Sequence, residues 1–181
     1  QAVLRLYNDV KVTIGPVIDE GFYYDFAREE SFTPEDLSKV EKEMQNIIEE
    51  KQKFERVEMS KEEALSLYSN NRYKQEVINE LPEDEKISVY YNKTEAGEQF
   101  FDLCSGPHLP DTSRIGAFKL LKVAGAYWRG DSENDMLQRI YGTCFASKKE
   151  LGAYLKRQEE AAKRDHRKLA KELELAMFSE L

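Results

Sequence analysis

The sequence has few cysteines and histidines, which are the residues that form disulfides and that most often bind zinc. Its 181 residues include two cysteines, Cys104 and Cys144, and two histidines, His108 and His166. Two cysteines are too few for a disulfide framework, so we expect reduced thiols in a cytoplasmic protein. A closed zinc site built from this chain would have to use every cysteine and histidine in it. We therefore expect the chain to hold no stoichiometric zinc.

Long apolar segments are also missing. No apolar run approaches the roughly 20 residues that cross a bilayer, and we expect neither a signal peptide nor membrane association. The formal net charge of −8 means that the average field disfavours nucleic acid. Residues 148–171 nevertheless carry nine basic and four acidic side chains. That stretch indicates either a local RNA-binding patch or a solvated helix with i,i+4 ion pairs.

Hydrophobic periodicity predicts an α+β fold with antiparallel sheets, packed helices and a long C-terminal helix. The expected strands span residues 10–14, 21–26, 54–59, 73–78, 87–91, 99–103, 117–123 and 136–145, and we expect 87–91 and 99–103 to form a hairpin. The expected helices span residues 1–7, 33–53, 60–69 and 148–175. The last helix has few large apolar residues for its length, so we expect it to stand off the globular part.

Reactive side chains are concentrated between Phe101 and His108. The apolar run before Gly106 predicts a strand, and Gly106-Pro107 predicts a turn. Side chains alternate along a strand, so Asp102 and Cys104 are expected on one face. The turn then brings His108 back beside Cys104.

This cluster of a carboxylate, a thiol and an imidazole allows several chemistries. A thiol nucleophile needs a lowered pKa on Cys104, which His108 could provide but Asp102 would oppose. General acid–base catalysis suits the three groups better, with a cation to stabilise a developing oxyanion. A satisfied polar cluster without catalytic function is the structural alternative.

Five motifs, in order along the chain, resemble bacterial threonyl-tRNA synthetase. They are Ile-Gly-Pro-Val with Gly-Phe-Tyr-Tyr-Asp at 14–25, Asp-Leu-Cys-Ser-Gly-Pro-His at 102–108, Gly-Ala-Tyr-Trp-Arg-Gly-Asp at 125–131, Leu-Gln-Arg-Ile-Tyr-Gly-Thr at 137–143 and Lys-Arg-Asp-His-Arg-Lys at 163–168. The resemblance spans essentially the whole chain. It implies that residues 1–147 form the editing domain, related to that of alanyl-tRNA synthetases. Residues 148–181 would be the linker helix and the start of the class II catalytic region.

The resemblance also implies what this chain does not contain. The aminoacylation core would follow residue 181, so ATP, magnesium and zinc are expected there, and no cofactor is expected within this chain. The full-length enzyme is expected to be a cytoplasmic homodimer formed through that core. The family's editing site also uses a His-x-x-x-His helix, and the resemblance places Gln1 four residues after its second histidine.

The activity implied by the resemblance is hydrolysis of the ester of mischarged seryl-tRNA(Thr). Position by position, the resemblance gives a site lysine, aspartate, cysteine and histidine at Lys74, Asp102, Cys104 and His108, and a pocket tyrosine at Tyr24. We expect Lys74 to supply positive charge, Asp102 to hold the substrate ammonium or orient water, and His108 to relay a proton.

The expected partner is the acceptor end of tRNA(Thr), bound mostly through its phosphates. The residues expected to contact it, besides the basic helix, are Arg114, Lys119, Lys122 and Arg129. Two alternatives remain open at this point. One is a free-standing zinc-dependent aminoacyl-tRNA deacylase, which would require the upstream histidines. The other is a module that grips the acceptor arm without catalysis.

Overall fold

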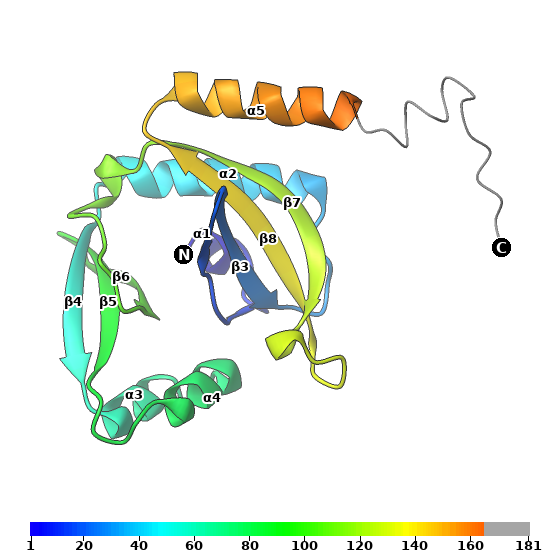
Figure 1. Ribbon diagram of the computed structural model, residues 1–181. Helices are drawn as coiled ribbons and strands as arrows, with labels where there is room; N and C mark the ends of the chain where they lie inside the picture. The colour runs from blue at the N-terminus through cyan, green and yellow to red at the C-terminus, as the bar shows by residue number, and fades with distance from the viewer. Residues whose placement is uncertain (165–181) are drawn as a thin grey trace, which may run out of the picture.

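The computed structural model describes residues 1–164, and within them it shows two antiparallel sheets with helices packed around them (Figure 1). The first sheet has the order β1 (Lys11–Val12), β3 (Gly21–Ala27), β8 (Met136–Phe145) and β7 (Ala117–Tyr127), and β2 (Val17–Ile18) also pairs with β3. The second sheet has the order β4 (Lys53–Met59), β5 (Ile87–Thr94) and β6 (Gly97–Leu103). The predicted α+β class is confirmed.

The helices lie on the faces and ends of these sheets. They are α1 (Ala2–Leu6), α2 (Pro34–Glu49), α3 (Lys61–Leu67), α4 (Arg72–Glu80) and α5 (Lys148–Lys163), with short 3-10 turns η1 (Thr112–Arg114) and η2 (Trp128–Gly130). The helix α2 starts where the sequence predicts. Thr33 and Asp36 form a capping box, and Pro34 occupies the first turn. It ends at Glu49, before the predicted residue 53, because β4 already begins at Lys53.

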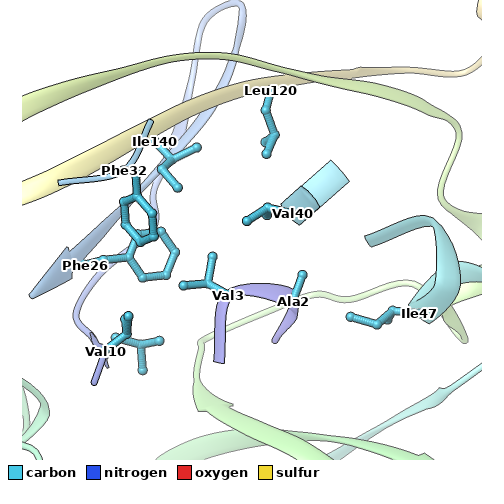
Figure 2. Close-up of a cluster of buried hydrophobic side chains, with 10 residues drawn as sticks. Ala2, Val3, Val10, Phe26, Phe32, Val40, Ile47, Leu120 and Ile140 are labelled. Atoms are coloured by element: carbon cyan, nitrogen blue, oxygen red, sulfur yellow. The ribbon is translucent and has the colours of Figure 1, made fainter. Parts of the chain in front are cut away.

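One hydrophobic core lies between the first sheet and the helices α1 and α2. Figure 2 shows its side chains converging from all of these elements. The buried members are Ala2, Val3, Val10, Val12, Phe26, Phe32, Val40, Ile47, Leu120 and Ile140. This core fixes β3 against α1 and α2, and Tyr24 of β3 packs against its edge.

Two further cores lie within residues 1–164. The second joins the β5–β6 hairpin to α3 and α4, and its buried members are Ala64, Tyr68, Ile78, Ile87 and Val89. The third joins α4 to the end of the first sheet, and its buried members are Tyr73, Trp128 and Leu137. The helix α4 therefore contributes to both cores, which fixes its position between the two sheets.

The predicted strand at residues 73–78 is wrong, because this segment is part of the helix α4. The Asn71 side chain accepts a hydrogen bond from the Lys74 backbone N–H and caps the helix. The buried residues Tyr73, Lys74 and Ile78 follow helical spacing. Asn71 therefore begins a second helix, although the sequence indicated only the end of the preceding one.

The expectation that the last helix stands off the globular part is also wrong for the residues that the structure describes. α5 lies along β7 and β8 (Figure 1). Its Tyr154 side chain is buried, with its ring centroid 5.1 Å from that of Phe145. The Tyr154 ring, together with a hydrogen bond from Gln158 Nε2 to Glu20 at 3.2 Å, docks the described part of the expected helix. The predicted extension to residue 175 lies outside the described residues.

Within residues 1–164, we find no helix with the length and apolar character needed to span a membrane.

Candidate active site

Three side chains from separate elements meet between the two sheets. Lys74 of α4 places its Nζ atom 2.5 Å from Asp102 Oδ1 on β6. The Tyr24 hydroxyl on β3 donates to Asp102 Oδ2 at 2.5 Å, although 78 residues separate the two. Lys74 Nζ also lies 3.4 Å from the Tyr24 hydroxyl oxygen. The structure therefore brings together three of the residues that the sequence predicted for the site.

Both charged side chains of the Lys74–Asp102 ion pair are largely buried. The Lys74 side chain is only 3% exposed and that of Asp102 16% exposed. An isolated charge at this depth would be costly, so each charge requires the other. Asp102 Oδ1 also accepts the Leu103 backbone N–H at 2.8 Å. Burial and the adjacent Asp102 carboxylate raise the pKa of Tyr24 well above its ordinary value, so Tyr24 stays protonated and acts as a donor.

The turn after β6 places Cys104 and His108 together, which confirms the predicted turn pair. His108 Nε2 lies 3.1 Å from Cys104 Sγ. The Gly106 backbone N–H also donates to that sulfur at 3.3 Å. Gly106 has a φ of +75° and precedes a cis bond to Pro107. The neighbouring strand anchors the start of the turn, because Ser88 Oγ donates to the Cys104 carbonyl at 2.5 Å.

The His108 imidazole is held between two aromatic rings. It stacks on Tyr90 with ring centroids 3.8 Å apart and planes 16° apart, and Phe54 contacts it edge-on at 5.1 Å. Burial of the ring lowers the pKa of His108, and the Asp102 charge opposes this shift. The residue as a whole remains exposed. His108 is therefore a neutral imidazole at pH 7 that solvent and ligands can reach.

Asp102 links the Lys74–Tyr24 pair to the Cys104–His108 turn. It contacts Lys74 and Tyr24 directly, and its charge acts on His108. A cation, a carboxylate, a phenol, a thiol and an imidazole thus lie around one strand end. This combination supplies what ester hydrolysis needs, namely a neutral base and a fixed positive charge.

The four cations expected to contact RNA lie elsewhere, on η1, β7 and η2. Lys119 pairs with Glu41 at 2.9 Å, and Arg129 pairs with Glu80. The Lys122 ammonium lies 4.9 Å from the centroid of the Tyr141 ring, and Arg114 ends η1. Their role in RNA binding stays a prediction.

Sequence reasoning missed three residues at the site: Tyr90, Phe54 and Tyr68. Tyr90 pairs with Asp102 across the β5–β6 hairpin, so the register of the predicted hairpin could have revealed it. Phe54 lies in a strand that was predicted, but its proximity to His108 is a tertiary contact. The Tyr68 hydroxyl is buried without a hydrogen-bond partner, and burial and the Asp102 charge raise its pKa.

The positions of the possible metal ligands in the described residues bear on the zinc-dependent alternative. Residues 1–164 contain no group of three or more His, Cys, Asp or Glu side chains placed to hold a metal ion. Cys104 and His108 are two donors, whereas a zinc site needs three or four protein ligands. The described part of the chain therefore offers no complete ligand set for the zinc-dependent alternative.

One segment of the chain matches a known protein family. Residues 87–141 match the family described as the threonyl and alanyl tRNA synthetase second additional domain. This segment runs from β5 to the middle of β8 and includes Asp102, Cys104 and His108.

Individual relatives extend the match over 99% of the chain. Identity is 56% to threonine–tRNA ligase of Geobacillus sp. (strain WCH70), 57% to that of Clostridium tetani (strain Massachusetts / E88) and 56% to that of Pelobacter propionicus (strain DSM 2379 / NBRC 103807 / OttBd1). These matches confirm the resemblance to bacterial threonyl-tRNA synthetases. The chain spans 28% of the length of these relatives.

Proposed function

We propose that this chain proofreads for a threonyl-tRNA synthetase by hydrolysing the ester of mischarged seryl-tRNA(Thr). Residues 1–147 would form the editing domain, and residues 148–181 the linker to a core that ligates threonine to tRNA(Thr) with ATP. The observation that carries the proposal is the buried Lys74–Asp102 ion pair directly before the Cys104–His108 turn. The match of residues 87–141 to the second additional domain family supports it.

The need for such a site follows from the chemistry of the substrates. Serine lacks one methyl group of threonine, and a pocket gains only about 1–3 kcal/mol from one such group. A synthetic site therefore makes errors that a separate hydrolytic site must remove. The second site acts on the product, which is the amino-acid ester at the 3′ end of the tRNA.

The proposed reaction is attack of water on the ester carbonyl carbon. His108 takes a proton from the water, the new C–O bond forms, and the ester C–O bond breaks. His108 then returns the proton to the leaving ribose oxygen, giving free serine and tRNA. Lys74 stabilises the oxyanion in between, and Asp102 holds the lysine in place through their ion pair. If Nε2–H donates to Cys104 Sγ, the ring nitrogen available as the base is Nδ1.

The tRNA acceptor end would be held by the cations on η1, β7 and η2, together with α5. We propose phosphate contacts for Arg114, Lys119, Lys122 and Arg129. Three of the four already contact a carboxylate or an aromatic ring within the protein. RNA binding by these three would therefore compete with contacts that are formed in the free protein.

Two activities measured on the full-length synthetase test the proposal. Lys74→Met and His108→Ala should each slow deacylation of seryl-tRNA(Thr) by about 10²–10³-fold. ATP-dependent threonylation should change little, because it belongs to another domain. Full deacylation by both variants would remove these residues from the mechanism. An equal loss of both activities would indicate a folding defect instead.

The two alternatives give different results in the same assays. A tRNA-binding module would bind tRNA(Thr) but leave seryl-tRNA intact in the unaltered protein. A zinc-dependent deacylase would carry one tightly held zinc per chain after dialysis and lose activity with a chelator.

A further inference from the structure

Tyr90 lies in the middle strand of the second sheet, where both sides of its backbone are paired. Its Cα partners are Arg56 on β4 and Asp102 on β6. Its side chain is 9% exposed. A ring attached to a central strand moves little, so Tyr90 offers a rigid surface beside the Cys104–His108 turn.

The turn is shaped to fit against this ring. A Cβ atom at Gly106 would lie 2.0 Å from the Tyr90 hydroxyl oxygen, and φ at Gly106 is +75°. Both facts require glycine at this position. The backbone of the turn therefore lies directly against Tyr90. The His108 ring stacks on the face of the Tyr90 ring, with the two centroids 3.8 Å apart.

His108 itself follows β6 and lies outside any helix or strand, with an exposed residue surface. Contacts with its neighbours therefore decide which of its side-chain rotamers is occupied. Tyr90 covers one face of the imidazole, Phe54 contacts it edge-on, and Cys104 Sγ meets Nε2. Parallel stacking restrains both torsions, because it fixes the plane of the imidazole as well as its position.

We propose that Tyr90 is a positioning residue, whose ring holds the His108 imidazole in the orientation in which a ring nitrogen acts as the base. The inference rests on the proposed function, since it assigns Tyr90 a part in the same hydrolysis. It assigns no contact between Tyr90 and the substrate. The ring, and not the phenolic hydroxyl, carries the role, because stacking uses the face of the ring.

The charge state of His108 follows from the same contacts. The titratable groups around it are Asp102 on β6, Cys104 on its own turn and the Tyr90 phenol on β5, while β4 contributes the apolar Phe54 ring. Burial lowers the pKa of His108, although Asp102 raises it. The face of an aromatic ring also attracts a cation, so the loss of hydration outweighs both attractions. Removing the Tyr90 ring admits water and should raise the pKa.

The test compares Tyr90→Phe, which keeps the ring, with Tyr90→Leu, which keeps a buried apolar side chain but cannot stack. The chain has two histidines, so His166→Gln assigns the His108 signals in a proton NMR titration. In the unaltered chain the imidazole protons should be shifted upfield by the Tyr90 ring current, with a pKa below 6.5. Tyr90→Phe should keep both properties. Tyr90→Leu should lose the upfield shift and raise the pKa.

Deacylation supplies the second measurement, on full-length synthetase. Tyr90→Leu should lower kcat for seryl-tRNA(Thr) hydrolysis by about 10–100-fold with KM little changed, and its pH profile should move to higher pH. Tyr90→Phe should stay within about 2-fold of the unaltered enzyme. Equal defects in both variants, or none in Tyr90→Leu, would overturn the proposal.

The two proposals fail in different ways. If the unaltered enzyme hydrolyses no seryl-tRNA, the proposed function fails, whatever the titrations show. If hydrolysis occurs but His108 shows no upfield shift in the unaltered chain, the role of Tyr90 fails alone. That NMR measurement needs no variant, so an unfolded Tyr90→Leu protein would not leave the question open.

Discussion

Replacing Lys74 with methionine removes one charge of the buried ion pair and leaves the other. Methionine keeps most of the length and apolar volume of the lysine stem, so the packing of α4 changes little. The Asp102 carboxylate then remains at 16% exposure with the Tyr24 hydroxyl and one backbone N–H as donors. The free energy of unfolding should therefore report the cost of leaving a buried carboxylate without its cation.

The expected magnitude is about 3 kcal/mol. Breaking a buried pair by removing one partner typically costs about 3–5 kcal/mol. The lower end applies because Asp102 keeps two hydrogen-bond donors and some exposure. With a urea m value of about 2 kcal/mol/M, the unfolding midpoint should fall by about 1.5 M.

The assay is equilibrium urea unfolding at pH 7, followed by circular dichroism. Lys163→Met is the matched control, because Lys163 makes an exposed i,i+4 pair with Glu159 at 2.6 Å. Such a pair is worth about 0.3–0.5 kcal/mol. The double variant Lys74→Met/Asp102→Asn removes both charges and should recover most of the loss. The reasoning is refuted if Lys74→Met costs no more than Lys163→Met, or if the double variant is less stable than Lys74→Met alone.

Two further predictions concern other parts of the fold. Hydrogen bonds from Arg5 lower the pKa of Glu50 from 4.5 to about 2, so its contribution to stability is present above pH 4.5 and lost as the pH falls toward 2. Glu50→Gln should flatten the pH dependence of the unfolding free energy over that interval, and an unchanged slope would contradict this. Trp128 is 5% exposed and donates from Nε1 to Glu76 at 2.7 Å. Trp128→Phe should cost about 2 kcal/mol in urea unfolding, and a loss below about 0.5 kcal/mol would show that this hydrogen bond is not stabilising.

Elements with strong local signals were predictable from the sequence. Thr33 and Ser60, which the sequence indicates as helix starts, both begin helices through capping boxes that the structure contains. The predicted hairpin of residues 87–103 is present because apolar strands flank a short turn with Gly97 in a positive-φ conformation. In these places the short-range physics of caps and turns decides the outcome.

The segment around Lys74 shows where such signals fail. Tyr73, Val77 and Ile78 are compatible with a strand, and the helix is decided by the Asn71 cap and by packing against two cores. The burial of Tyr154 against Phe145 is likewise a tertiary contact that the composition of α5 does not reveal. Whether a short segment forms a helix or a strand therefore depends on tertiary contacts, which the sequence alone does not reveal.

The site itself was predictable only in part. The Cys104–His108 turn follows from local spacing, and the structure confirms it. The meeting of Lys74, Asp102 and Tyr24 was expected from the resemblance, since sequence separations of 50 and 78 residues give no local signal. Tyr90 was missed because its role depends on how closely the turn approaches a neighbouring strand.

Within residues 1–164, each member of the ion-pair group lies next to a different hydrophobic core. Tyr24 borders the core of the first sheet, Asp102 lies between two residues that pack on the second core, and Lys74 follows a buried residue of the third. A conservative substitution in one core should shift the adjacent member of the group, Tyr24, Asp102 or Lys74, by a fraction of an ångström relative to the other two. Substitutions in the cores should consequently change the geometry of the site without replacing any of its residues. Variants selected for altered accuracy should therefore be sought in the packing between the cores as well as in the pocket.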